Sequence, residues 1–408
     1  MSMFTEYFLM GIEHVKKYVS TKLKGFEKIE DLSCVEIGDG NLNYVFRVVN
    51  NATNESVIVK QAGPQARISE SIVLSTDRNR IETEVLMLEA EKTPDLVPII
   101  YLYDTVMNCC VMEDLKDFKI MRKELINGKK FSFFSDKIST FMAENLIRTT
   151  DFMLDPKEKK KMQKQFINPE LCEISEELVF TEPFIDFKSQ NILTNGNETW
   201  IEKEFYQDEK LHIQVAKLKQ QFLTHGQALL HGDLHTGSIF INDQNIKVID
   251  PEFAFYGPIG YDAGNIIANL TFAWARHVVQ KEDSFILWVE ETLKHTIQNF
   301  REKSLKILAE SKEPFAKYES VLCNYLDEII RDSIAFSGLE LSRRIIGLAK
   351  VADITTIEDN DQRILAERLC LTIAKNCIMD EDIMDIDSYL FLIQRLKKEL
   401  LVNGISYN

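Results

Sequence analysis

The first third of the chain and the remainder carry different hydrophobic patterns, and this contrast restricts the fold more than any other feature. After an opening helix expected to end near Lys24, short runs rich in β-branched and aromatic residues follow in quick succession. Such runs predict β-strands. They lie at 34–37, 44–49, 57–60, 97–103 and 109–112. We therefore expect a five-stranded antiparallel sheet in this part of the chain.

A single helix is expected to interrupt the sheet, because Ile81, Val85 and Leu88 recur at helical spacing after the candidate caps Thr76 and Asp77. From Leu115 onward, apart from 239–249, the pattern is long, charged and helical. Its strongest stretches are 131–153, 203–227, 282–312, 361–377 and 383–402. The expected fold class is α+β, with an N-terminal lobe at 1–113, a mainly helical C-terminal lobe at 114–408, and a ligand cleft between them.

Charge and cysteine content narrow the classes of partner. The net charge is −16 over 408 residues, so DNA or an anionic membrane would be bound against the overall field, and we expect neither as a partner. Seven cysteines without a C-x-x-C pair predict a reduced, cytoplasmic protein. Residues 1–17 do not fit a secretory signal, and no apolar run is long enough to span a bilayer. The lysine-rich run 157–164 fits one solvated helix face.

Two segments of the predicted sheet could contact a nucleotide. The turn from Gly38 to Asn43 joins two strands, and its glycines would let backbone N–H groups approach phosphate oxygens, although a plain hairpin turn has the same pattern. Lys60 ends the next strand. It is either a solvated edge residue or a cation held by a helix carboxylate and directed at phosphates. Glu84 is better placed than Glu82 for that carboxylate, because it lies four residues before Leu88, but both remain open.

Two carboxylates in the second half stand where apolar strands meet loops. Asp233, within His231-Gly232-Asp233-Leu234-His235, could accept a proton from a hydroxyl substrate. Asp250 and Glu252 would point the same way from an extended segment and could share Mg²⁺ beside phosphates. The structural alternative makes both histidines packed core residues and Asp233 a cap.

The order of these segments resembles the protein-kinase-like phosphotransferases of the aminoglycoside and choline kinase type. The sequence of the individual motifs is similar to that of the methylthioribose kinase family from about residue 30 to about residue 358. The matching segments are Gly38-Asp39-Gly40-Asn41-Leu42-Asn43, Val59-Lys60-Gln61, Val111-Met112-Glu113-Asp114-Leu115, His231 to Ser238 and Asp250 to Pro258. This resemblance implies a bilobal fold, ATP and Mg²⁺ as cofactors, a small-molecule substrate and a homodimer.

The resemblance also implies a role for each matching residue on the nucleotide side. Lys60 would bind the phosphates, paired with Glu84. Asp250 and Glu252 would hold Mg²⁺. The loop would cover the nucleotide, and backbone groups at the lobe junction would contact adenine; these residues are Gly38, Gly40, Asn41 and Asn43 in the loop and Glu113 and Leu115 at the junction.

On the substrate side, the resemblance implies that Asp233 activates the C1 hydroxyl of 5-methylthioribose, giving 5-methylthioribose 1-phosphate in methionine salvage. Arg343 and Arg344 would reach the substrate and the transferring phosphate. Without the resemblance, these arginines would be assigned to a solvated helix face. The alternatives are another small-molecule kinase of the aminoglycoside or choline type and a kinase-like scaffold without activity.

The chain departs from the protein-kinase pattern at one place and from the pattern of the resembling family at two. Ser238 stands where protein kinases carry a metal-binding Asn, as it does in the resembling family. Ile72-Val73 replaces a Trp-Pro pair, and Lys350 stands where His is usual. The last two departures put closure of a lid over the nucleotide in question.

Overall fold

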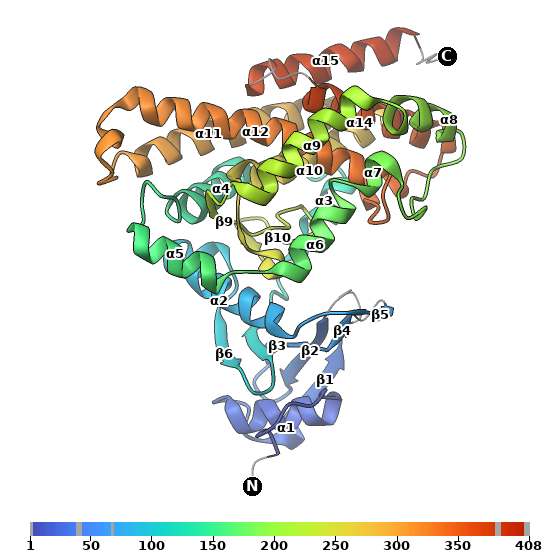
Figure 1. Ribbon diagram of the computed structural model, residues 1–408. Helices are drawn as coiled ribbons and strands as arrows, with labels where there is room; N and C mark the ends of the chain where they lie inside the picture. Colours follow the sequence, from blue (N-terminus) through green and yellow to red (C-terminus); the bar gives the residue numbers. More distant parts are fainter. Residues whose placement is uncertain (1–2, 38–42, 67–68, 380–384, 404–408) are drawn as a thin grey trace.

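The computed structural model describes residues 3–37, 43–66, 69–379 and 385–403. Its chain folds into a small sheet-containing lobe and a larger helical lobe, with the two termini at opposite ends of the molecule (Figure 1). This arrangement confirms the predicted bilobal α+β fold. The strand β7 (Cys109–Glu113) ends at the residue after which the boundary between the lobes is predicted.

The sheet of the small lobe has five antiparallel strands in the order β1-β2-β3-β7-β6. All five sequence-predicted strands are present, with bounds shifted by a few residues. They are β1 (Leu32–Glu36), β2 (Asn43–Asn50), β3 (Glu55–Ala62), β6 (Ile100–Asp104) and β7 (Cys109–Glu113). A separate two-stranded ribbon joins β4 (Gln65–Ala66) and β5 (Ser69–Val73).

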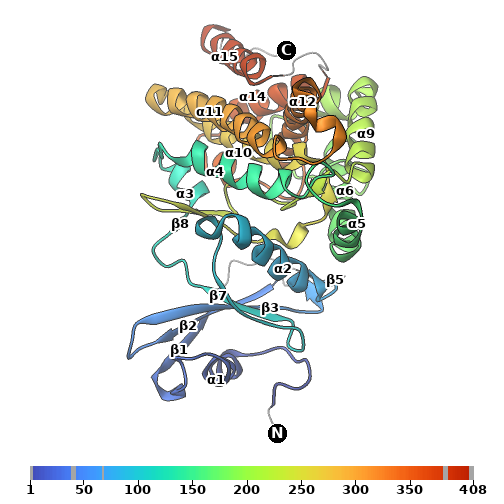
Figure 2. The same ribbon diagram turned by 90° about the vertical axis from the view of Figure 1, so that its left-hand side faces the viewer.

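Two helices flank this sheet. The first, α1 (Ile12–Lys22), covers the face that points away from the helical lobe, and it packs on β1 and β2. The second, α2 (Asp77–Lys92), lies between the sheet and the helical lobe in both views (Figures 1 and 2). The helix expected around Ile81, Val85 and Leu88 is therefore present, and its position brings its side chains to the junction of the two lobes.

The large lobe is built around α10 (Ile259–Gln280), which is buried along almost its whole length, and α12 (Glu319–Ile345), whose C-terminal half is mostly buried; the two helices pack against each other. The remaining helices surround them. They are α3 (Met121–Ile126), α4 (Phe134–Met142) with its π-helical continuation η3 (Ala143–Ile147), α5 (Pro156–Gln165), α6 (Pro169–Leu178), α7 (Glu182–Ile185), α8 (Glu198–Ile201), η4 (Glu202–Tyr206), α9 (Glu209–Thr224), α11 (Asp283–Leu308), α13 (Ala352–Thr355), α14 (Asn360–Met379) and α15 (Ile386–Asn403).

Short strands at the base of the large lobe fix the loops that face the small lobe. The hairpin of β10 (Ile239–Ile241) and β11 (Ile246–Val248) also pairs with β8 (Lys119–Ile120). Beside it, β9 (Ala228–Leu229) pairs with β12 (Tyr256–Gly257). Asp233 lies between β9 and β10, and Asp250 begins the 3-10 turn η5 (Pro251–Phe253) after β11. The two loops therefore leave neighbouring strands toward the same junction.

The prediction for the lysine-rich run, which lies in helix α5, is wrong at one lysine. The run was expected to be a solvated face, yet the Lys159 side chain is buried. The Lys159 ammonium donates to the carboxylate of Asp151 and to the carbonyl of Gln227, 3.0 Å away. The other four lysines of the run are exposed.

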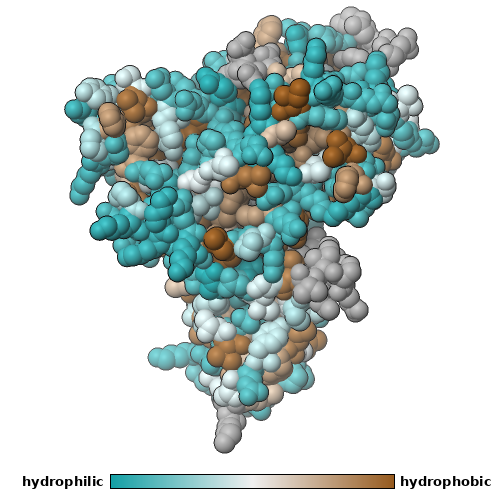
Figure 3. All heavy atoms as spheres, in the orientation of Figure 1, coloured by the Kyte–Doolittle hydropathy of each residue, from teal (hydrophilic) through white to brown (hydrophobic). Residues whose placement is uncertain are grey.

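The face of the molecule shown in Figure 3 is largely hydrophilic, with apolar residues in separate groups. Among the described residues, no helix has the length and apolar character needed to cross a bilayer. Cys109 and Cys110 are buried in β7, as expected for packed strand residues.

Candidate active site

Lys60 forms the centre of a charged cluster at the junction of the lobes. Its side chain is buried near the end of β3. Its ammonium Nζ lies 2.7 Å from Glu82 Oε1 on α2 and 2.6 Å from Asp250 Oδ1 on the large lobe. One lysine thus connects the sheet, the helix and the second lobe, so the solvated-edge alternative for Lys60 is excluded.

The prediction that Glu84 pairs with Lys60 is wrong. Glu82 is fully buried and shares a face of α2 with Val85, Leu86 and Glu89. Glu84 points elsewhere, and its Oε2 accepts a hydrogen bond from Arg80 Nη1 at 2.9 Å. The buried face of α2 therefore includes the carboxylate at 82, whereas the sequence argument had used Leu88, which is only partly buried.

The cluster around Lys60 contains more carboxylates than cations. Burial raises the pKa of Glu82 and of Glu252, and neighbouring Asp250 adds to both shifts. Burial alone would lower the pKa of Lys60, but the charges of Asp250 and Glu82 raise it well above its ordinary value. Lys60 is therefore held as an ammonium, and the excess of negative charge favours an additional cation.

Asp250 and Glu252 present oxygen atoms suited to a hard divalent cation. Asp250 adopts a left-handed backbone conformation, with φ of 64°, which is uncommon for a residue other than glycine and concentrates at functional sites. Glu252 Oε2 accepts a hydrogen bond from Asn43 Nδ2 at 2.8 Å. Within the described residues, no group of three or more His, Cys, Asp or Glu side chains forms a metal site by itself. Two carboxylates fit Mg²⁺ that arrives with nucleotide phosphates supplying further ligands.

Asp233 forms a second charged cluster close to the first. Its Oδ2 lies 3.3 Å from His235 Nε2, and its Oδ1 lies 3.4 Å from Arg343 Nη2 and 3.5 Å from Arg344 Nη2. Burial would raise the pKa of Asp233, yet His235, Arg344 and Arg343 hold it well below its ordinary value. The three contacts are long, so the ionised carboxylate keeps acceptor capacity for a substrate hydroxyl.

Arg343 and Arg344 end α12 with buried side chains, which rules out the solvated helix face. Glu340 holds both: its Oε1 accepts from Arg344 Nε at 2.9 Å, and its Oε2 accepts from Arg343 Nε. Although burial opposes it, the charge of Glu340 contributes to raising the pKa of Arg343. Two buried guanidinium groups facing one carboxylate are suited to bind oxygen-rich anions such as phosphate.

The hydrogen bonds of His235 define its tautomer. Nδ1 lies 3.0 Å from the backbone nitrogens of Gly237 and Ser238, and both can only donate. Nδ1 is thus the acceptor, and the proton is on Nε2, which faces Asp233. Burial lowers the pKa of His235, so this neutral tautomer is the form near pH 7. His235 is therefore more than a packed core residue, because its Nε2 contacts the carboxylate of Asp233.

His231 joins the loops that carry Asp233 and Asp250. It is buried, as the structural alternative expected, and its Nε2 donates to the carbonyl of Ile249 at 2.9 Å. Burial lowers its pKa to about 4, and the charges of both Asp233 and Asp250 oppose that shift. His231 Nδ1 also accepts from the backbone N–H of Asp233 at 3.3 Å, so one imidazole links Asp233 to the residue directly before Asp250.

The same loops also meet through their backbones. Gly232 has φ of +83°, and a Cβ there would lie 2.2 Å from the carbonyl oxygen of Phe253. Asp262, near the start of α10, accepts hydrogen bonds from the backbone N–H groups of His231 at 2.7 Å and Gly232 at 3.0 Å. The position of Asp233 is thus fixed from α10 as well as from the Asp250 loop.

The other predicted nucleotide contacts are placed as follows. Gly38, Gly40 and Asn41 lie outside the described residues. Asn43 contacts Glu252, and Arg78 Nε donates to Asn43 Oδ1 at 3.1 Å. The N–H of Glu113 already donates to Ile99, so an adenine contact at this residue falls to its carbonyl oxygen. Leu115 follows at the lobe junction, with its carbonyl accepting from Phe118.

The three departures noted in the sequence lie as follows in the structure. Lys350 Nζ donates to the carbonyls of Ile345 and Ile346 at the end of α12, so it caps the helix that carries the arginine pair. Burial lowers its pKa to about 8. Ser238 Oγ lies 3.2 Å from His235 Nδ1, within the Asp233 loop. Ile72 and Val73 end β5.

Sequence reasoning missed the residues that support the two clusters. Glu340 could have been found, because acidic and basic residues three and four positions apart meet on a helix. Asp262 carries no such local signal, since its partners lie about 30 positions earlier. The same is true of Asn168, whose Nδ2 donates to the carbonyls of Glu252 and Ala254.

Comparison with known proteins agrees with this geometry. Residues 186–284 match the model of the "Phosphotransferase enzyme family". A methylthioribose kinase of Geobacillus sp. (strain WCH70) is 41% identical over 365 residues, which cover 89% of this chain and 90% of that protein. A methylthioribose kinase of Bacillus pumilus is 40% identical and covers 93% of this chain and 96% of that protein.

The fold also has a counterpart among solved structures. The choline kinase from Cryptosporidium parvum matches with a TM-score of 0.50 and 14% identity, over 97% of this chain and 98% of that chain. This likeness concerns the fold alone. The sequence identity to the curated relatives extends over most of both chains. The chain therefore belongs to the methylthioribose kinase family and is a small-molecule kinase.

Proposed function

We propose that the protein transfers the γ-phosphoryl group of ATP to the C1 hydroxyl of 5-methylthioribose, giving 5-methylthioribose 1-phosphate and ADP, as a step of methionine salvage in the cytoplasm. One observation carries this proposal: His231 hydrogen-bonds to the backbone of Asp233 and of Ile249, the residue before Asp250, and Asp250 contacts Lys60. Phosphoryl transfer requires cations on the phosphate oxygens and a positioned hydroxyl, and little covalent chemistry from the protein.

On the nucleotide side, Lys60 supplies a fixed ammonium. Glu82 orients it from α2, and Asp250 contacts it from the large lobe. Asp250 and Glu252 would hold Mg²⁺, which when bound neutralises charge on the β- and γ-phosphates. Because Lys60 and Asp250 are paired, the residue that binds phosphate and the residue that binds metal are positioned together.

On the substrate side, Asp233 accepts the proton of the attacking hydroxyl. The sugar oxygen forms its bond to the γ-phosphorus as the bond from that phosphorus to the bridging oxygen of ADP breaks, and the proton moves to the Asp233 carboxylate. Arg343 and Arg344 balance the charge of the transferring group. Their anchoring by Glu340 means that they need no reorganisation during the reaction.

An ADP-release assay with 5-methylthioribose, choline and an aminoglycoside tests the substrate. We expect turnover with 5-methylthioribose alone, and a phosphorus NMR signal of a product phosphorylated at C1. Turnover of choline or the aminoglycoside, with none of the sugar, would contradict the proposal and favour the other kinase types. Light scattering tests the homodimer, which is proposed from the resemblance.

A further inference from the structure

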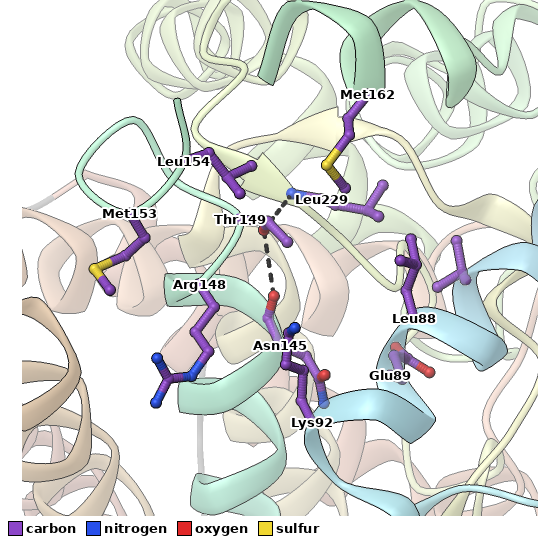
Figure 4. Close-up of a pocket in the computed structure, with 11 residues that line it drawn as sticks. Leu88, Glu89, Lys92, Asn145, Arg148, Thr149, Met153, Leu154, Met162 and Leu229 are labelled. Carbon is purple, nitrogen blue, oxygen red and sulfur yellow. Dashed lines mark hydrogen bonds between the residues drawn. The ribbon is translucent and has the colours of Figure 1, made fainter. Parts of the chain in front are cut away.

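A cavity of about 310 Å³ lies beside the C-terminal half of α2, away from the residues assigned to phosphoryl transfer. Figure 4 shows its lining side chains converging from α2, from the end of the α4 and η3 segment, and from β9. Leu88 and Glu89 come from α2, and Arg148 and Thr149 directly follow η3. The volume is at the lower end of the range for small-molecule sites, so it suits a compact ligand.

Glu89 is the unusual residue in this lining. It is 5% exposed, and its Oε2 has no hydrogen-bond partner. Nor does the structure show an ion pair for it among the described residues. Burial, together with the nearby charge of Asp262, raises its pKa well above the ordinary value. A buried carboxyl without a partner is costly, and such a group in a cavity wall indicates that a ligand supplies the missing donor.

The cavity also contains cations and apolar surface. The Lys92 side chain is 38% exposed, and among the residues that the structure describes its one ion pair is a 3.9 Å contact with Glu91. Arg148 uses Nε and Nη1 to bind Glu144 and Glu310, which leaves Nη2 as a further donor. Most of the remaining lining is apolar, formed by Val85, Leu88, Met153, Leu154, Met162 and Leu229.

We propose that this cavity binds an α-amino acid with an apolar side chain. The ammonium would pair with Glu89, the carboxylate with Lys92 and Arg148, and the side chain would contact the apolar wall. A simple amine would leave the cations unused, and a simple carboxylic acid would leave Glu89 unpaired. Of the small ligands that fit the volume, the amino acid is the one that matches all three parts of the lining.

The site is connected to the catalytic region by α2 and by Asp262. Glu89 lies two helical turns after Glu82 on the same face of α2. Asp262, whose charge acts on Glu89, holds the backbone of His231 and Gly232. An ammonium at Glu89 would therefore favour the position of α2 in which Glu82 meets Lys60, and we expect it to tighten ATP binding. This coupling rests on the proposed nucleotide role of Lys60, whereas the binding itself does not.

Calorimetric titration of the full chain tests the site with L-leucine and L-methionine as probes. We expect both to bind, and 4-methylpentanoate and 3-methylbutylamine, which lack the ammonium and the carboxylate respectively, to bind at least about tenfold more weakly. Glu89→Gln should weaken leucine binding by about tenfold or more while the protein stays folded, because the amide keeps the shape. Glu91→Gln is the control on the same helix, since an exposed pair contributes little.

Absence of heat with either amino acid up to about 10 mM would overturn the site. So would equal binding of leucine and 4-methylpentanoate, or unchanged binding by the Glu89→Gln protein. ATP titrations with and without saturating leucine test the coupling. Bound leucine with an unchanged ATP affinity would overturn the coupling alone, and ATP that fails to bind at all would contradict the proposed function instead.

Discussion

His235 Nε2 lies 3.3 Å from Asp233 Oδ2 while its Nδ1 accepts from the backbone of the same loop. The imidazole of His235 is thus held by the backbone of its own loop through Nδ1, and it orients the carboxylate of Asp233 through Nε2. Asp233 is therefore positioned by its own loop as well as by the arginines of α12.

This relationship predicts the effect of His235→Asn. The asparagine oxygen can still accept from the Gly237 and Ser238 amides, but its shorter side chain cannot reach Asp233. We expect kcat to fall by about tenfold or more, because a hydrogen bond to a charged group is lost, with little change in KM for ATP. Steady-state kinetics at varied ATP measures both. A larger change in KM for ATP than in kcat would contradict the positioning role.

Asp233→Asn removes the proposed proton acceptor. Turnover should fall by roughly 10² or more, the usual contribution of a positioned base, while ATP binding is retained. Asp243→Asn is a control, since that carboxylate is exposed on the adjoining hairpin. Near-normal turnover of the Asp233→Asn protein would exclude the assigned role.

Glu82→Gln and Glu84→Gln form a matched pair on α2. Glu82→Gln weakens the anchor of Lys60 and should raise KM for ATP by about tenfold. Glu84→Gln changes a partly exposed pair with Arg80 and should leave KM within about twofold. The reverse order of effects would restore the sequence-based assignment of Glu84.

Glu252→Gln tests the proposed metal site. The amide is a weaker ligand for a hard cation, so half-maximal activity should require more Mg²⁺. The measurement is a magnesium titration at saturating ATP. Superimposable titrations of the variant and the unmodified protein would remove Glu252 from the site.

The pH dependence follows from the buried groups. The pKa of Asp233 is held well below its ordinary value, and burial lowers that of His231 to about 4. Titration of Asp233 and His231 should therefore reduce activity only as pH falls through about 4. Burial raises the pKa of Glu82 to about 8 and also raises that of Glu252, so loss of activity at higher pH is expected from these two carboxyls. Saturating Mg²⁺ should shift the part due to Glu252 to lower pH. Circular dichroism at each pH separates titration from unfolding, and an acidic limb that Mg²⁺ does not shift would contradict the assignment of Glu252 to the metal site.

The strands of the small lobe could be predicted because their β-branched runs are short and separated by turns. The helices α10 and α12 were absent from the strongest predicted stretches, although they form the centre of the large lobe. Every residue from Ile259 to Val279 is buried, including the polar residues Asp262, Asn265 and Asn269, and α10 contains few charged residues. The outer helices α9 and α11 contain more charged residues, which matches the long, charged helical pattern on which the prediction relied.

The structure brings together candidates that were chosen from their chemistry and their order in the sequence, and their roles stay predictions. The choice of the helix carboxylate was wrong, because it depends on which face of the helix is buried. Lys60, Asp233 and Asp250 stand next to strand ends and could be identified from spacing. The choice between Glu82 and Glu84 depends on which side of α2 meets the sheet, and a pattern with apolar residues on several faces does not fix that side. The burial of Arg343 depends on Glu340 and on packing against α10, which only the fold provides.

The close approach of Gly232 to Phe253 leaves no space for a side chain between the two loops. Relaxing or shifting either loop alone would open a gap or create a clash, so neither can drift in evolution without a matching change in the other. Variation in substrate preference among proteins with this architecture should therefore be confined to surrounding helices, and the paired loops should be inherited as one unit.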